Sequence, residues 1–458
     1  MVLLQPKQKI QLTIKKLGIN GEGIGYYRKL IVFVPNALPD EEVIVEITRA
    51  TPKYAEGKLR KILKKSLDRI SPACKFYDQC GGCQLQHLNY SAQLDFKRDL
   101  LNQALNKFKP QGYQNYELRP TIGMDNPWYY RNKAQFQLRF NQKNKRIEAG
   151  LYRENSHQLV AIDDCLVQEK TTQKVLNTIT RLLNRYQIPI YDERKKTGLL
   201  KTLMVRIGVK TGQVQVVFIA VKDKIPQLAN LLRLIKEQLP EVVSIMLNLQ
   251  PKKTSIVMGD ETKVLWGKET IDEQINEVSF HLSARAFFQL NPKQTEVLYQ
   301  QAIHALDLSG TEKVVDAYCG VGTIGLSLAK YAKEVRGMDI IPSAIEDAKE
   351  NAKKLGLTNT HYEVGTAEKL LPKWLKEGFQ PDAIVVDPPR TGLDQKLLKA
   401  LLQHPVKTLV YVSCNVSTLA QNLVELSQIY QVDYLQSVDM FPHTARCEVV
   451  CKLTLKQK

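Results

Sequence analysis

Short apolar strands separated by turn residues fill the first part of the chain. Apolar and polar positions alternate over residues 10–14, and further apolar strands are predicted over 30–34 and 43–47. A glycine-rich stretch at 18–25 and the sequence Pro-Asp-Glu-Glu at 39–42 supply the turns. Such spacing predicts a small closed β-barrel of OB-like shape, which is typical of many oligonucleotide-binding modules.

The middle of the chain mixes helical and strand patterns. A basic, aromatic stretch at 128–133 precedes strand-like alternation over 135–140, and a helical pattern covers 175–186. Three further strands are expected, at 203–209, 214–221 and 243–248. This mixture indicates an α+β domain that carries no obvious catalytic motif of its own.

Strands and helices alternate regularly from about residue 287. Asn291 and Pro292 form a good helix start, with asparagine at the N-cap and proline at the first helical position. Strands separated by helical segments are predicted at 314–317, 334–338, 361–364, 383–386 and 408–413. This alternation predicts an α/β, Rossmann-like domain with a mostly parallel, doubly wound sheet. Two later strands, at 433–440 and 448–455, are expected to form an antiparallel edge of that sheet.

A chain of 458 residues is long enough for two to four domains, each with its own core. We expect three in a multidomain fold: a barrel over 1–64, an α+β domain over 65–282 and an α/β domain over 283–458. No apolar run approaches the roughly 20 residues that cross a bilayer, and the first residues lack the layout of a signal peptide. We therefore expect a cytoplasmic protein with no membrane partner and no obligate protein partner.

Positive charge is concentrated in the N-terminal third. The chain has 65 Lys+Arg against 47 Asp+Glu, a formal charge of +18, and residues 1–150 hold 26 of the former and 13 of the latter. A polyanionic partner bound mainly by this part is the simplest explanation. The alternative is a basic surface that only keeps the protein soluble.

Polar residues follow the predicted strands of the α/β domain at their carboxyl ends, where ligands bind in open α/β sheets. They are Asp316 and Tyr318, Asp339, Asp387 and Cys414. A glycine-rich turn at 320–322 lets a ligand approach the backbone, and no basic residue is placed for a pyrophosphate. S-adenosylmethionine fits better than a dinucleotide, with Asp339 on the ribose. The competing interpretation of Asp339 is a helix N-cap.

Two motifs near the carboxyl end concern the chemistry. Asp387 begins a stiff Asp-Pro-Pro-Arg loop that also occurs in amino-methylating enzymes, so it does not select the reacting atom. Cys414 and Glu448 do select the reacting atom, because together they suit methylation at C5 of uracil. A thiolate that adds to C6 makes C5 nucleophilic, and a carboxylate then removes the C5 proton. The alternative for Cys414 is a small buried side chain that ends a strand.

Four cysteines form a second cluster of chemical interest. Cys74, Cys80 and Cys83 lie within ten residues and flank a Gly-Gly bend, and Cys165 is the candidate fourth ligand. Four thiolates suit zinc or an iron–sulfur cluster, and the spacing does not decide between them.

These motifs together resemble the RNA uracil-5 (m5U) methyltransferase family, in particular its bacterial type with a TRAM domain and a [4Fe-4S] cluster. The resemblance covers nearly the whole chain: residues 18–39 resemble the TRAM barrel, and Phe-Phe-Gln-Leu-Asn at 287–291 resembles the motif before the sheet of a class I methyltransferase. It implies a [4Fe-4S] cluster on Cys74, Cys80, Cys83 and Cys165. It also implies S-adenosyl-L-methionine on Gln289, Tyr318, Asp339 and Asp387, with Cys414 as nucleophile and Glu448 as proton acceptor.

The resemblance implies an RNA partner with a flipped-out uridine, read by stacking on Phe287, Phe288 or the aromatic residues near Trp128. The iron–sulfur motif favours 23S ribosomal RNA over transfer RNA. Three positions depart from the family: Asp339 stands where glutamate is usual, Arg446 where histidine or valine is commoner, and Asp40 where glycine is usual.

Other functions stay open from the sequence alone. A transfer-RNA uridine methyltransferase shares all the catalytic motifs, and an RNA cytosine-5 methyltransferase shares the thiolate step. A non-catalytic RNA-binding iron–sulfur protein would use only the barrel and the cysteines. A radical enzyme with a TRAM domain normally needs Cys-x-x-x-Cys-x-x-Cys, which differs from the spacing here.

Overall fold

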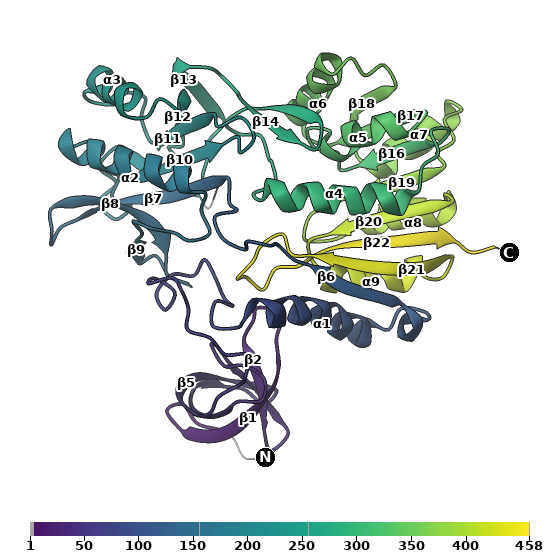
Figure 1. Ribbon diagram of the computed structural model, residues 1–458, viewed down its shortest axis with the longest axis horizontal. Helices are drawn as coiled ribbons and strands as arrows, with labels where there is room; N and C mark the ends of the chain where they lie inside the picture. The colour runs from purple at the N-terminus through teal and green to yellow at the C-terminus, as the bar shows by residue number, and fades with distance from the viewer. Residues whose placement is uncertain (1–3, 155, 255, 458) are drawn as a thin grey trace. The chain divides into compact units, whose positions relative to one another are not determined.

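A computed structural model describes residues 4–154, 156–254 and 256–457 of the chain (Figure 1). The first three residues, part of the segment tested above for a signal peptide, lie outside this range. The chain divides into two compact units. The first consists of residues 1–125, 388–398 and 411–458, and the second of 126–387 and 399–410.

The N-terminal part of the first unit is a closed five-stranded barrel in the order β1-β2-β3-β5-β4. Its strands are β1 (Lys9–Leu17), β2 (Gly23–Tyr27), β3 (Leu30–Val34), β4 (Glu42–Ala50) and β5 (Tyr54–Lys64). Alternate side chains such as Ile10, Leu12 and Ile14 fill the interior, as the period of two requires. The expected barrel is therefore present. Glu41, fully buried beside it, binds Arg69 and the backbone N–H of Leu38.

The cysteine-rich segment follows the barrel and leads into α1 (Tyr90–Phe108). Asn89 caps this helix by accepting a hydrogen bond from the N–H of Ala92 at 2.8 Å. A short 3₁₀ turn (Tyr113–Asn115) and β6 (Glu117–Ile122) come next. α1 packs against β6 and against α9 (Val416–Leu426) of the same unit.

A seven-stranded sheet in the order β13-β12-β11-β10-β7-β8-β9 begins the second unit. Its strands are β7 (Lys133–Asn141), β8 (Arg146–Tyr152), β9 (Leu159–Ala161), β10 (Leu200–Ile207), β11 (Val214–Ala220), β12 (Val242–Leu249) and β13 (Glu261–Gly267). Helices α2 (Lys170–Arg185) and α3 (Leu228–Gln238) accompany it, and α2 packs on β7, β8 and β10. This sheet matches the α+β character expected for the middle of the chain.

The rest of the second unit carries the alternating β/α elements. The hairpin β14 (Ile271–Ile275) and β15 (Val278–Leu282) precedes α4 (Pro292–Leu306), whose N-cap is Asn291 as predicted. Parallel strands then lie in the order β18 (Thr360–Val364), β17 (Glu334–Asp339), β16 (Lys313–Ala317), β19 (Ala383–Val386). Helices α5 (Thr323–Leu328), α6 (Pro342–Lys354) and α7 (Ala367–Lys376) connect them, with a 3₁₀ turn at Ala329–Tyr331.

The last elements are α8 (Gln395–Gln403), β20 (Thr408–Ser413), α9, β21 (Tyr430–Val438) and β22 (Glu448–Leu455). β21 and β22 pair antiparallel, but the expectation that they form the edge is wrong. β6 adds to β21 in parallel, so the order is β20-β22-β21-β6 and a strand from far upstream is the edge. In the described part of the chain, no helix combines the length and apolar character needed to cross a membrane.

Candidate active site

Three carboxylates stand at the carboxyl ends of neighbouring parallel strands in the second unit. Asp316 lies in β16, Asp339 ends β17 and Asp387 follows β19. Asp316 is fully buried, and its Oδ2 accepts the backbone N–H of Gly325 at 2.7 Å. Burial raises the pKa of Asp316 to about 8, helped by the charges of Asp387 and Asp339. Burial also raises the pKa of Asp387 to about 7.

The glycine loop after β16 is shaped for close approach by a ligand. Tyr318, half-buried, has φ +67°, a conformation that costs free energy for a residue with a side chain and that is frequent at binding sites. Gly320 also has positive φ, and a Cβ there would meet open space. Asp339 holds the loop: its Oδ2 accepts the N–H of Gly320 at 3.0 Å, and its Oδ1 accepts that of Ile341 at 2.9 Å.

Gln289 lies in a segment of the second unit whose backbone carbonyls accept hydrogen bonds from side chains elsewhere in that unit. The side chain of Asn132 donates to the Gln289 carbonyl at 3.2 Å. Arg206, buried at 2% exposure, donates to the carbonyls of Ser283 and Ala286 at 3.0 and 2.7 Å. Sequence reasoning missed both, because an isolated asparagine and an arginine within an apolar strand carry no motif.

The two phenylalanines before Gln289 have different surroundings. Phe288 is buried and packs against Phe280, with ring centroids 5.7 Å apart. Phe287 is 74% exposed. Of the two, only Phe287 is therefore placed to stack on a base without rearrangement.

Cys414 lies in the first unit, between β20 and α9. It is half-buried, not sealed in the interior. Asn415 caps α9 by accepting the N–H of Ser417 at 3.1 Å, and its Nδ2 donates to the carbonyl of Arg390 at 2.9 Å. Cys414 therefore directly precedes the N-cap of α9, at the end of the helix where the dipole is positive.

Arg446 and Arg390 add positive charge to the surroundings of Cys414. Burial lowers the pKa of Arg446, the charge of Arg390 lowers it further, and Cys414 opposes both effects. Arg446 is thus close enough to Cys414 for their charges to interact. Because arginine stands here instead of the histidine or valine that is commoner in the family, a permanent cation lies near Cys414.

Glu448, 6% exposed, begins β22 only two residues after Arg446 and pairs in register with Val438. The loop that leads to it is held by a buried ion pair between Lys97 of α1 and Asp439. Tyr90 donates to Asp439 at 2.9 Å, and Lys97 also donates to the carbonyl of Phe441 at 3.1 Å.

The other cysteines of the carboxyl half are buried. Burial raises the pKa of Cys319 and of Cys451 well above the usual range of a thiol, and that of Cys447 to about 12. Because the thiolate is the reactive form, these sulfurs are poor nucleophiles. Their burial indicates that these three cysteines serve as packed core residues.

The cysteine-rich segment supplies donors that suit an iron–sulfur cluster. Cys74, Cys80 and Cys83 are half-buried, and Cys80 Sγ accepts the N–H of Gly82 at 3.3 Å, as cluster thiolates often do. Cys165, also half-buried, belongs to the second unit. Within the described residues, no three or more Cys, His, Asp or Glu side chains gather as a metal site.

Comparison with known proteins connects both units to one enzyme family. The TRAM domain matches residues 4–59, and the tRNA (Uracil-5-)-methyltransferase family matches residues 89–458, which is well over half of the chain. The chain belongs to the tRNA (uracil-5-)-methyltransferase family. It is thus a TRAM-containing RNA uracil-5 methyltransferase, which confirms the resemblance seen in the sequence.

Relatives in this family cover the whole chain. An "Uncharacterized RNA methyltransferase" of Enterococcus faecalis is 69% identical over 99% of both chains, and one of Listeria monocytogenes is 55% identical over 98% of both. A solved structure, Pyrococcus abyssi tRNA (uracil-54, C5)-methyltransferase in complex with S-adenosyl-L-homocysteine, is 29% identical. It matches with a TM-score of 0.77 and covers 97% of this chain and 100% of that one. The enzyme therefore methylates RNA at uracil C5 with S-adenosylmethionine as the donor.

Proposed function

We propose that the enzyme methylates C5 of one or more uridines in 23S ribosomal RNA, with Cys414 as nucleophile and Glu448 as base. The observation that carries this assignment is the position of Cys414. Cys414 is half-buried, it directly precedes the N-cap of α9, and its charge interacts with that of Arg446, which Glu448 follows two residues later in the chain.

The reaction uses each group once. The Cys414 thiolate adds to C6 of uracil, and the electron pair of the C5–C6 bond forms an enolate. C5 then attacks the methyl group of S-adenosylmethionine, and S-adenosylhomocysteine leaves with the electron pair of the broken bond. Glu448 takes the C5 proton, which restores the C5–C6 double bond and releases the thiolate.

We assign donor binding to residues of the second unit. The open space at Gly320 suits close approach of the donor, and Tyr318 flanks it with a strained backbone. Asp339, which also holds the loop, is proposed to bind the ribose, and Asp387 and Gln289 complete the donor site. Protonation of Asp387 near neutral pH makes its carboxyl group a hydrogen-bond donor as well as an acceptor.

Cys74, Cys80, Cys83 and Cys165 are proposed to hold a [4Fe-4S] cluster that supports folding and RNA positioning and takes no part in methyl transfer. The three half-buried thiols and the N–H···S bond at Cys80 support this. Iron and sulfide analysis of anaerobically purified protein tests it. We expect about four irons per chain and a loss of the visible absorbance in Cys80→Ser. Zinc in place of iron would overturn the proposal.

Covalent trapping tests the two catalytic roles. The intact enzyme should form an adduct with 5-fluorouridine RNA that survives denaturing gels, and Cys414→Ala should form none, while the buried-cysteine control Cys451→Ala still does. Glu448→Gln should accumulate adduct with ordinary uridine RNA, because proton removal is slowed. Methylation by Cys414→Ala, or normal turnover by Glu448→Gln without adduct, would remove that residue from the mechanism.

The identity of the RNA has a second candidate. The archaeal enzyme that resembles this chain over nearly its full length acts on transfer RNA at uracil 54, which favours transfer RNA as the alternative. Mapping 5-methyluridine in both RNAs from cells with and without the gene decides. Loss confined to 23S ribosomal RNA supports the proposal, and loss confined to transfer RNA overturns it.

A further inference from the structure

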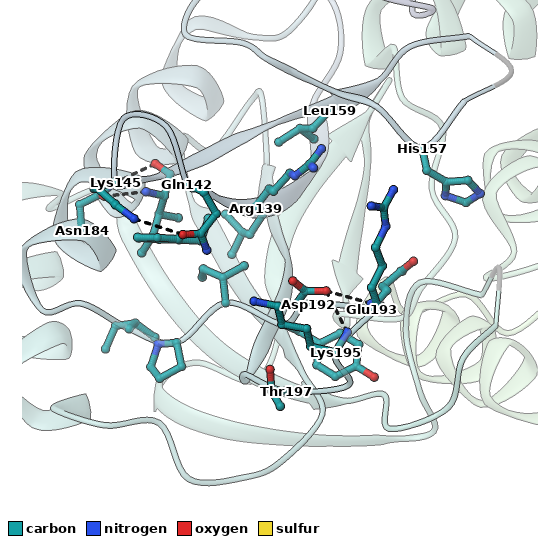
Figure 2. Close-up of a pocket in the computed structure, with 18 of the residues that line it drawn as sticks. Arg139, Gln142, Lys145, His157, Leu159, Asn184, Asp192, Glu193, Lys195 and Thr197 are labelled. Atoms are coloured by element: carbon teal, nitrogen blue, oxygen red, sulfur yellow. Dashed lines mark hydrogen bonds between the residues drawn. The ribbon is translucent and has the colours of Figure 1, made fainter.

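A large hollow lies in the second unit, formed by the ends of β7 and β8, the end of α2 and the segment after it. Its volume is about 1100 Å³. Pockets for small ligands typically measure about 300–1000 Å³, so this hollow is at least as large as most of them. None of the residues assigned above to catalysis, the donor or the cluster lines it (Figure 2).

Aromatic rings are exposed in this hollow. Tyr152 is 37% exposed and makes an edge contact with His157, with ring centroids 5.6 Å apart. Phe140, at the end of β7, is 39% exposed. Exposed rings that are already held by neighbours lose little entropy on binding, and flat ligands such as nucleobases stack on them.

Positive charge surrounds these rings. The lining contains four cationic side chains, Arg139, Lys145, Arg194 and Lys195, against the two carboxylates Asp192 and Glu193. Figure 2 shows Arg139, Lys145 and Lys195 among them. Arg139 and Glu193 both act electrostatically on Tyr152, whose pKa is raised chiefly by burial. Arg139 is therefore near the Tyr152 ring, and the other cations line the same hollow, as a ligand with both bases and phosphates would require.

The segment that carries Arg194 and Lys195 is held in one shape. Asp192 Oδ1 accepts the backbone N–H groups of Arg194 and Lys195 at 2.9 and 3.1 Å, so this carboxylate is occupied within the turn. The N–H of Asp192 donates to the carbonyl of Thr197 at 2.7 Å. Gly198, with φ +99°, closes the turn where a Cβ would lie 2.1 Å from the carbonyl of Ile190.

We propose that this hollow binds an unpaired stretch of the substrate RNA that flanks the target uridine. Bases stack on Tyr152 and His157, and phosphates contact Arg139, Arg194 and Lys195. A duplex would keep its bases stacked on each other and leave the rings unused, so single-stranded RNA is the ligand. The inference rests on the enzyme acting on RNA, but not on which RNA or on Cys414.

Binding assays with the full-length enzyme test the proposal. The probes are a short single-stranded RNA of mixed sequence and a duplex of the same length. Tyr152→Ala should weaken single-strand binding on the order of tenfold and leave duplex binding unchanged, while Tyr152→Phe, which keeps the ring, should bind normally. With substrate RNA, KM should rise and kcat should stay constant.

A double substitution of two exposed cations provides an independent test. Because Arg194 and Lys195 are exposed, replacing them should not disturb folding. Arg194→Gln with Lys195→Gln should lower the slope of log K against log salt by up to about two. The matched control, Arg233→Gln with Lys236→Gln on α3, removes equal charge outside the hollow and should change nothing. Unchanged binding in the hollow variants, or equal weakening by the α3 pair, would overturn the proposal. Trapping on 5-fluorouridine RNA at saturation reports on Cys414 separately.

Discussion

Burial separates side chains of the same type into different roles in this protein. Cys414 is half-buried at a helix start, whereas Cys319, Cys447 and Cys451 are enclosed in protein that raises their thiol pKa. The sequence distinguishes them only through neighbours, such as the polar Ser413 and Asn415 beside Cys414. Solvation, which decides reactivity, requires the fold.

The buried carboxyl of Asp316 leads to a prediction about pH. Its pKa is raised from 3.8 to about 8, so the folded chain holds a proton that the unfolded chain has already lost above about pH 4. Asp316 therefore lowers the free energy of unfolding as the pH rises between these values. Asp316→Asn keeps an oxygen for the Gly325 N–H, and should become more stable relative to the parent by up to about 1.4 kcal/mol per pH unit.

Urea denaturation of both proteins at several pH values from 5 to 8 measures this difference. Subtracting the two curves cancels the titration of other groups, including most of that of Asp387. A difference that stays constant over the range would show that Asp316 is ionised in the folded protein.

The elements were predictable from the sequence where local pattern decides them. The parallel strands β16, β17, β18 and β19 lie within a residue or so of the predicted positions, and an apolar run followed by an aspartate marks β19 most clearly. β6 was missed, since its partner β21 follows about 300 residues later and nothing local specifies the pairing. The acids and Cys414 carry motifs, whereas Lys97, Arg206 and Asn132 act only through long-range contacts.

The helix α1 holds the loop before β22 through the buried pair of Lys97 and Asp439, so breaking this pair should have a large effect. Lys97→Met leaves a buried carboxylate uncompensated and should cost about 3–5 kcal/mol of unfolding free energy. Lys97→Met with Asp439→Asn should recover part of the loss. Denaturant titration measures all three proteins.

The same helix offers a control at an exposed ion pair. Arg98 and Asp95 are both solvent-exposed, so Arg98→Ala should change stability by less than about 0.5 kcal/mol. The loop that carries Glu448 should also loosen in Lys97→Met, and adduct on uridine RNA should accumulate. A Lys97→Met enzyme as stable as Arg98→Ala would show that the pair does not hold the loop.

For the whole molecule, we expect the net charge of +18 and its concentration before residue 150 to attract RNA. Long-range attraction steers a polyanion and is screened by salt. The barrel contributes exposed lysines along β5, among them Lys61 and Lys64. Its closed sheet offers no unpaired edge, so we expect these side chains to provide its contacts with phosphate.

Salt dependence of RNA binding tests this role of the barrel. Lys61→Gln with Lys64→Gln should reduce the slope of log K against log salt by up to about two, because each phosphate contact releases about one counterion. The control pair Lys349→Gln with Lys354→Gln removes the same charge from α6, where both lysines pair with glutamates. It should leave the slope unchanged. Equal slopes for the two pairs would mean that RNA responds to total charge alone, and that the barrel makes no specific contact through β5.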